Sequence, residues 1–455
     1  MASKSARTVS RRSLLKSAAA AAGGGAAAFV AGDALAARAQ QGASPAVLTN
    51  TQAGRRVRAL IKYRNELPSV EQITLRAIGG RQVVIRVEAC QCCYSQVTQA
   101  LVTGNQVGLG IGQNAPITQA TILGHGCVGI VEAVGPQVQK VQVGDRVLTN
   151  QHSQCGVCYN CMRMRGDKCM NNSVGQIADF DRLAVTGALG GGGMTEVTVV
   201  PEEYAVPVFT DIPPGQLSNI SCVSNCGLGM TMTLAPVEIA SDVVVFGAGP
   251  VGLSAVQGAR IKGATQIIVV EPVPYRRELA MKLGATAALD PNVERDGLVK
   301  KIQEMCTGKV AKTDRRFAGG GNVGPDHVIE AVGGDRLPPK TERGPDPTGV
   351  QVLQQGWDLC SQIGTYVTCS IGHPYNANVQ FPAAQWADAA KHFLPGTMGG
   401  FNARRDTPRF IRLIESGQFN MAALAPTTFP LARAKDAFQG AADRTVIATA
   451  VLPNT

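Results

Sequence analysis

The chain has 455 residues, of which 45% are hydrophobic and 17% are charged. This length is ample for two or more domains with sizeable cores, and the composition excludes a disordered chain. The net charge of +10 would suit a nucleic-acid-binding protein, but no basic run with interleaved aromatic residues is present, so we expect no nucleic-acid partner.

The first 39 residues have the layout of an export signal. They carry six basic residues against one acidic residue, and Arg11 and Arg12 precede a weakly hydrophobic, Ala- and Gly-rich stretch over 17–35. An A-x-A cleavage motif ends at Ala39. This pattern predicts a twin-arginine signal peptide at 1–39 and a periplasmic or secreted mature protein made from a cytoplasmic precursor. An uncleaved anchor and a disordered tail are the alternatives.

The half of the chain that follows is β-rich. Residues 70–90 alternate apolar and polar side chains around the turn glycines Gly79 and Gly80, which is typical of short antiparallel strands. Residues 120–150 continue the pattern, so the sequence predicts a barrel-like domain. No stretch after the signal is long and apolar enough to span a bilayer, and we expect no stable membrane span in the mature chain.

Four cysteines then lie close together in the pattern C-x2-C-x2-C-x7-C: Cys155, Cys158, Cys161 and Cys169. Four thiolates at this loop spacing fit a closed tetrahedral zinc site. Disulfides and an iron–sulfur cluster are the alternatives. We expect structural zinc, and metal-bound thiolates would also be better protected in an oxidising compartment.

The character of the sequence changes near residue 240. Residues 243–246 and 267–270 are continuous apolar runs, as in strands that are buried on both faces, and an Ala-rich helix is expected between them. A strand–helix–strand unit of this kind predicts a parallel sheet. Residues 308–350 are rich in Gly, Pro and charged residues, and we interpret part of this stretch as inserted surface loops.

A dinucleotide motif directly follows the first buried strand. It reads G-x-G-x-x-G and comprises Gly247, Gly249 and Gly252. These glycines would permit a tight turn, a close approach to a pyrophosphate and close helix–strand packing. Glu271 ends the second strand, where a carboxylate would accept hydrogen bonds from ribose hydroxyls and disfavour a 2′-phosphate, so NAD is expected. Arg276 and Arg277 lie nearby and leave NADP open. The alternative is a glycine-rich turn in a strand–helix–strand protein that binds no dinucleotide.

The order of these features resembles that of zinc-dependent medium-chain alcohol dehydrogenases. A cysteine in V-E-A-x-x-x-C, the pair Gly124-His125, the four-cysteine lobe, a further cysteine and the glycine motif follow one another from about residue 55 to the C-terminus. The resemblance implies an α/β protein with a GroES-like β-barrel-type catalytic domain and a Rossmann doubly wound parallel sheet. The implied limits are 40–225 for the catalytic domain with its zinc lobe, 226–385 for the NAD-binding domain and 386–455 for a return to the catalytic domain.

By this resemblance, Cys93, His125 and Cys222 would hold a catalytic zinc, with Cys226 as the rival third ligand. Spacing alone would not link these residues, since isolated buried cysteines and histidines are usually core residues. Ser95 would take the substrate's proton. The resemblance also implies that Arg444 contacts the pyrophosphate and that residues 326–333 form the strand beside the cofactor. Arg276 is a further expected cofactor contact, because it lies close to Glu271 in the sequence.

The sequence also departs from the family pattern. Gly126 and Gln96 stand where the family usually has carboxylates near the zinc, Tyr94 stands where His or Arg often touches the pyrophosphate, and Thr98 replaces a common relay histidine. The lost carboxylates should alter how the metal is tuned. Gln151, on the loop that enters the zinc lobe, would make a substrate pocket more polar, unless it merely faces solvent.

The expected function is hydride transfer between a small-molecule alcohol, or its aldehyde or ketone, and NAD(H). A polyol or formaldehyde dehydrogenase of the same family is one alternative, and a non-catalytic zinc- and nucleotide-binding redox sensor is another. A homo-oligomer is expected. Because free NAD is scarce outside the cytoplasm, we also expect the exported protein to keep its cofactor bound and to recycle it in place.

Overall fold

A computed structural model describes residues 52–63, 66–103, 120–181, 183–188, 191–306, 324–334, 340–342, 346–369, 373 and 377–455. The predicted signal peptide and much of the predicted loop region 308–350 lie outside these residues. The described residues all belong to one compact unit, Leu48–Thr455. Among them, no helix combines the length and the apolar character that crossing a membrane requires.

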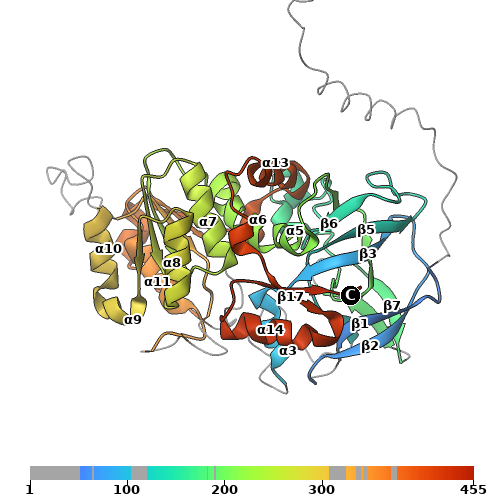
Figure 1. The fold of residues 1–455 in the computed structure, drawn as a ribbon. Coiled ribbons are helices and arrows are strands. Elements are labelled where there is room, and N and C mark those ends of the chain that lie inside the picture. Colours follow the sequence, from blue (N-terminus) through green and yellow to red (C-terminus); the bar gives the residue numbers. More distant parts are fainter. Residues whose placement is uncertain are drawn as a thin grey trace, which may run out of the picture. The chain divides into compact units, whose positions relative to one another are not determined.

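The first half of the described chain forms a closed barrel and a mixed sheet (Figure 1). The barrel strands, in spatial order, are β1 (Arg56–Lys62), β2 (Ser69–Leu75), β7 (Gln176–Phe180), β8 (Leu183–Gly187) and β4 (Ala120–Ile122). The mixed sheet runs β10 (Ala205–Pro207), β6 (Arg146–Thr149), β5 (Cys127–Val134), β3 (Gln82–Gln91), β18 (Thr449–Leu452) and β17 (Thr427–Pro430), and β9 (Val197–Pro201) also pairs with β3. The β-rich, barrel-like domain predicted from the alternating pattern is confirmed.

The second half contains a six-stranded sheet in which every neighbouring pair is parallel. Its order is β13 (Ala287–Leu289), β12 (Gln266–Val270), β11 (Asp242–Phe246), β14 (His327–Glu330), β15 (Thr365–Thr368) and β16 (His392–Pro395). This is the doubly wound order 3-2-1-4-5-6 of dinucleotide-binding sheets. The Rossmann-type α/β fold implied by the sequence is confirmed.

Strand β11 shows why its apolar run is continuous. Val243 and Val245 pack into a core with helices α7 (Pro250–Ile261) and α8 (Pro274–Leu283). Val244 and Phe246 point to the opposite face, into a core with α10 (Leu298–Cys306) and α11 (Val350–Leu359). Because both faces are covered, every position of the strand must be apolar.

The chain then returns to the first half. After β16 come α13 (Ala403–Glu415), β17, α14 (Ala434–Asp443) and β18, which pairs antiparallel with β3. The parallel sheet therefore extends past residue 385, since β16 begins at His392. This last strand is short, lies at the sheet edge and is only partly buried.

The remaining described helices are short. They are α3 (Val97–Leu101), α4 (Tyr159–Met162), α5 (Pro214–Ile220), α6 (Val223–Gly229), α9 (Pro291–Glu294) and α12 (Ala383–Asp388). Helix α6 joins the two halves, because a Cβ on Gly227 would lie 2.3 Å from the Val251 carbonyl oxygen of α7. Only glycine permits this approach, which fixes the residues before α6 next to the parallel sheet.

Candidate active site

The three residues proposed as catalytic zinc ligands converge. One ligand atom from each of Cys93, His125 and Cys222 lies within 4.8 Å of the others, and the two Sγ atoms are 3.9 Å apart. Two thiolates on one tetrahedral zinc, with Zn–S distances of about 2.3 Å, would be about 3.8 Å apart. A Cys2His set leaves a fourth coordination position for a substrate, so the donor set fits a catalytic zinc. Cys222, rather than its rival Cys226, belongs to this group.

Strand pairing explains the convergence. Strands β3 and β5 are antiparallel, and Cys90 faces Cys127 at the end of the pairing. The residues just after β3 therefore lie beside those just before β5, which brings Cys93 next to His125. Cys222 precedes α6 and arrives from the junction with the parallel sheet.

The pair of thiols favours one thiolate even without a metal. A hydrogen bond from the Cys222 thiol and the nearby His125 hold the pKa of Cys93 well below its usual range, although burial opposes them. Burial raises the pKa of Cys222. The Gln151 side-chain amide donates to the Cys222 sulfur and is itself buried. Since the thiolate is the form that binds zinc, the lowered pKa of Cys93 prepares one ligand of the site for a cation.

His125 is held on both ring nitrogens. Ser95 Oγ lies 2.9 Å from Nε2, and the Gln91 carboxamide lies 3.5 Å from Nδ1 and 3.3 Å from the His125 carbonyl oxygen. Gln91 Nε2 makes both contacts and donates to the carbonyl oxygen, so the carboxamide fixes the position of His125 beside Cys93 and Cys222. Ser95 then has its hydroxyl beside the metal position.

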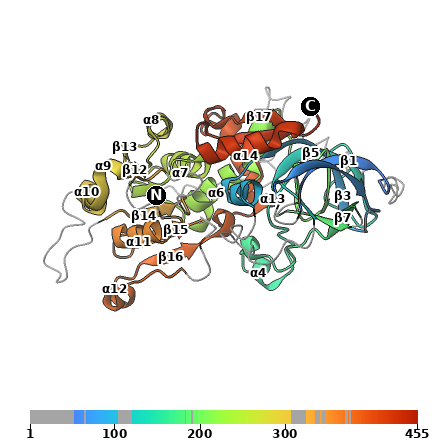
Figure 2. The same cartoon turned by 90° about the horizontal axis from the view of Figure 1, so that it is seen from below.

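The four-cysteine lobe forms a second group. The Sγ atoms of Cys155, Cys158, Cys161 and Cys169 lie within 4.8 Å of one another. The Cys158 and Cys169 sulfurs are 4.0 Å apart, and each accepts a backbone N–H. All thirteen cysteines lie in the described part of the chain and all are free thiols, which argues against the disulfide alternative. Figure 2 shows α4 of this lobe standing out from the barrel strands.

Backbone contacts suit the lobe to a metal and fix it to the return segment. Hydrogen bonds from backbone N–H groups lower the pKa of Cys158 to about 6, so this thiol ionises near neutral pH. The Gln154 side chain accepts from Ala403 N at 2.8 Å and donates to the Phe401 carbonyl oxygen at 3.0 Å. The lobe therefore braces residues 401–403, which lead into α13.

The glycine motif has the geometry of a dinucleotide turn. Gly247 has φ +88°, and a Cβ on Gly252 would meet the Gly247 carbonyl oxygen at 1.9 Å. A Cβ on Gly249 would meet only Arg276 Nη1, at 4.0 Å. The turn itself thus requires glycine at 247 and 252. At Gly249, by contrast, the space beside the backbone is open and lies next to the Arg276 guanidinium. An open cradle of this kind fits a pyrophosphate.

Glu271 lies buried at the end of β12, next to this turn. Its Oε2 accepts from Ala248 N at 2.7 Å and its Oε1 accepts from Val273 N at 3.0 Å. Arg277 is engaged elsewhere, with Nη2 2.9 Å from Asp290 Oδ2. A carboxylate fixed in this way is ready to accept ribose hydroxyls with its remaining lone pairs.

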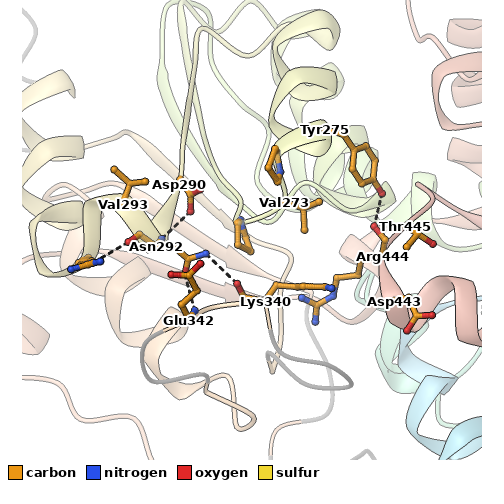
Figure 3. Close-up of a pocket in the computed structure, with 13 residues that line it drawn as sticks. Val273, Tyr275, Asp290, Asn292, Val293, Lys340, Glu342, Asp443, Arg444 and Thr445 are labelled. Atoms are coloured by element: carbon orange, nitrogen blue, oxygen red, sulfur yellow. Dashed lines mark hydrogen bonds between the residues drawn. The ribbon is translucent and has the colours of Figure 1, made fainter.

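A cavity of about 860 Å³ begins directly after Glu271, at the carboxyl ends of β12 and β13 (Figure 3). It reaches from Asn292 to Arg444, which ends α14 in the left-handed conformation at φ +57°. Tyr275 links the two halves of the unit here, since its hydroxyl donates to the Arg444 carbonyl oxygen at 2.9 Å and accepts from Arg276 Nε at 3.0 Å. Arg276 Nη1 therefore lies beside the open glycine turn, and Arg444 lines the cavity next to Tyr275.

Comparison with known proteins agrees with this geometry. The model of the alcohol dehydrogenase GroES-like domain matches residues 79–210, and that of the zinc-binding dehydrogenases matches residues 250–339. Alcohol dehydrogenase-like 7 of Arabidopsis thaliana is 25% identical over 399 residues, which are 84% of this chain and 92% of that protein. The chain is therefore similar to zinc-dependent alcohol dehydrogenases, in two separate segments by the family models and along most of its length by this relative.

Two further relatives support the family. Geraniol dehydrogenase of Castellaniella defragrans is 31% identical over 252 residues, 53% of this chain and 64% of that enzyme. The crystal structure of benzyl alcohol dehydrogenase from Acinetobacter calcoaceticus has the same fold, with a TM-score of 0.72, 23% identity and coverage of 88% of this chain and 99% of that one. This chain is thus an oxidoreductase of the alcohol dehydrogenase type.

The departures from the family pattern have structural reasons in this dehydrogenase. Gly126 has φ +73°, and a Cβ there would lie 2.4 Å from Ser221 Oγ, so no glutamate fits. Gln96 accepts from Gly124 N at 3.0 Å and fixes the backbone before His125. Tyr94 is paired with Arg444, whose Nη2 lies 3.3 Å from the tyrosine hydroxyl. The neutral amide of Gln96 thus replaces one of the family's carboxylates, and Ser221 occupies the space that the other would need.

Several residues of this dehydrogenase site were not found from the sequence. Gln91 faces His125, and His152 Nδ1 lies 2.6 Å from Met398 Sδ, a residue 246 positions away in the chain. No local pattern signals these contacts. Cys369 follows β15, and Cys93 and Cys226 add to the effect of burial in raising its pKa. Its place at the carboxyl end of a parallel strand was a usable signal, because ligand sites lie at that edge.

Proposed function

We propose that this dehydrogenase oxidises a small-molecule alcohol with NAD, or reduces the corresponding aldehyde or ketone with NADH. The observation that carries the proposal is the Cys2His cluster of Cys93, His125 and Cys222 within the same compact unit as an open glycine turn. When bound there, zinc would lower the pKa of the substrate hydroxyl and the nicotinamide would accept the hydride.

The side chains supply binding and proton transfer. Cys93, Cys222 and His125 would hold the metal and would leave one position for the substrate oxygen. Ser95 Oγ, 2.9 Å from His125 Nε2, would accept the proton that the substrate hydroxyl releases and pass its own hydroxyl proton outward to solvent. Gln151, which donates to Cys222, stabilises the thiolate and gives the metal surroundings a polar amide.

Preference for NAD over NADP rests on Glu271. Its carboxylate is buried and held by two backbone N–H groups, so it stays in place to accept ribose hydroxyls and to repel a 2′-phosphate. Arg277 is neutralised by Asp290, which removes one of the two arginines that could have received that phosphate. Arg276 is packed between Tyr275 and the Val446 carbonyl oxygen, beside the glycine turn.

The test is a panel of primary, secondary, aromatic and polyol substrates with NAD or NADP, run beside zinc quantification. We expect two zinc ions per chain and turnover with NAD. Cys93→Ser should remove one zinc and the activity, whereas Cys306→Ser, a buried thiol on α10 away from the site, should keep both. One zinc ion per chain with no turnover of any substrate would favour a zinc- and nucleotide-binding sensor instead.

We also propose that residues 1–39 direct twin-arginine export of the folded protein, and that the exported enzyme keeps its cofactor. The Arg11-Arg12 pair supports the export proposal. Replacing both arginines by lysine should leave the protein in the cytoplasm when cells are fractionated, and export of that variant would contradict it. Denaturing freshly purified protein should release nicotinamide dinucleotide, and protein free of cofactor would count against retention.

A further inference from the structure

Asn292 holds a short segment of backbone across the cavity. Its Nδ2 donates to the Lys340 carbonyl oxygen at 3.1 Å, and its Oδ1 accepts from Glu342 N at 2.8 Å. A neighbouring β-strand would bond a backbone carbonyl and a backbone N–H in the same way. Both polar atoms of the Asn292 carboxamide therefore bind the backbone of residues 340–342. We call these three residues the strap.

The strap is connected to the end of β12 through side chains. Asn292 N donates to Asp290 Oδ1 at 2.9 Å, and Asp290 Oδ2 pairs with Arg277 Nη2 at 2.9 Å. Arg277 Nη1 in turn donates to the Glu271 carbonyl oxygen at 2.7 Å. The residue proposed to bind the ribose and the residue that holds the strap thus share one bonded network.

The strap also forms part of the cavity wall. Lys340 and Glu342 line it together with Val273 and Tyr275, and Figure 3 shows the two pairs on different sides of the space. The cavity starts where β12 and β13 end, which is the adenosine side of a sheet with this strand order. A dinucleotide whose ribose reaches Glu271 would therefore have its adenosine between the strap and residues 273–275.

We propose that Asn292 is a cofactor-retention residue: by fixing the strap, it closes the outer wall of the adenosine site and slows release of the dinucleotide. This inference rests on the proposed function, because it requires that the cavity receives a nicotinamide dinucleotide. Breaking both hydrogen bonds in the Asn292→Ala variant should speed release about ten-fold.

The experiment uses the full mature protein with zinc. NADH is bound, then displaced by excess ADP-ribose, and its release is followed by fluorescence in a stopped-flow instrument. The Kd of ADP-ribose, which lacks the nicotinamide, is measured by calorimetry. Asn454→Ala is the matched control, because Asn454 Nδ2 also bonds two backbone oxygens, of Val87 and Glu196, at the far end of the chain.

Asn292→Ala should release NADH about ten-fold faster and bind ADP-ribose about ten-fold more weakly, while its KM for the alcohol stays unchanged. Asn454→Ala should leave both cofactor readouts at wild-type values. Wild-type release rates in Asn292→Ala, or equal changes in the two variants, would overturn the retention role. Wild-type protein that binds neither NADH nor ADP-ribose would instead overturn the proposed function.

Discussion

The prediction most tightly set by geometry concerns Gly126, the residue after the ligand His125. An alanine there must adopt φ +73°, which costs about 1–2 kcal/mol for an L-residue. Its Cβ would also lie 2.4 Å from Ser221 Oγ and 2.9 Å from Ser221 Cβ, and relieving such overpacking costs about 1–3 kcal/mol. We expect Gly126→Ala to be destabilised by about 3 kcal/mol in all.

Calorimetry should show this as a fall in Tm of about 6–12 °C, at about 2–4 °C per kcal/mol for a domain of roughly 200 residues. The strain is shared with His125, so the zinc content should also fall from two towards one per chain. Gly417→Ala is the control, because Gly417 has the same φ of +73° but nothing within 4 Å of its Cβ position. The Gly417→Ala variant therefore measures the free-energy cost of the positive φ alone.

A second variant separates the steric cost. Ser221→Gly removes both atoms that crowd the new Cβ, so Gly126→Ala in that background should recover about 1–3 kcal/mol relative to the sum of the single changes. The reasoning is refuted if Gly126→Ala unfolds at the same temperature as Gly417→Ala and keeps two zinc ions.

Four other outcomes are expected. Glu271→Gln should weaken NADH binding about ten-fold, because the variant loses a charged acceptor. The ratio of the Kd of NADPH to that of NADH in fluorescence titrations should therefore fall, and an unchanged ratio would contradict this. Ser95→Ala should lower kcat about 100-fold with little change in the KM of the alcohol, and Ser95→Thr should restore it. Cys155→Ser should lose one zinc ion and lower Tm, whereas retention of both would argue against the lobe site. Burial lowers the pKa of His152 to about 4. Because the unfolded chain then binds more protons below about pH 6.5, stability should be full above that pH and decline towards pH 4. A His152→Asn variant should show a flatter decline in pH-dependent melting.

The parallel sheet was predictable because its signals are local. The apolar run at 243–246, the glycines that follow it and Glu271 lie within thirty residues, and each reflects a requirement of the strand–turn–helix unit itself. The zinc lobe was predictable for the same reason, since its four cysteines fall on one loop. In both cases the chemistry and the backbone geometry are set by neighbouring residues.

The metal site required more than local pattern. Cys93, His125 and Cys222 are brought together by the β3–β5 register and by the α6–α7 junction, neither of which residue spacing reveals. Resemblance to a family supplied the link. It could not supply the amides of Gln91 and Gln151, because their contacts with the ligands depend on how side chains from separate elements pack.

The Gly126 position illustrates how the structure changes an interpretation. From the sequence, the missing carboxylate there was expected to alter how the metal is tuned. The structure shows that Ser221 fills the space that a glutamate side chain would need. The absence of the carboxylate is therefore a property of the local packing and is no evidence against catalysis.

The central claim is that two sulfurs and one imidazole share a metal with an exchangeable position. Anomalous diffraction at the zinc edge tests it most directly. The account predicts two peaks, one within the four-cysteine lobe and one about 2.0–2.3 Å from Cys93 Sγ, His125 Nε2 and Cys222 Sγ, with a solvent molecule as its fourth ligand. A single peak in the lobe, or a second zinc closed by a fourth protein thiolate such as Cys226, would contradict it.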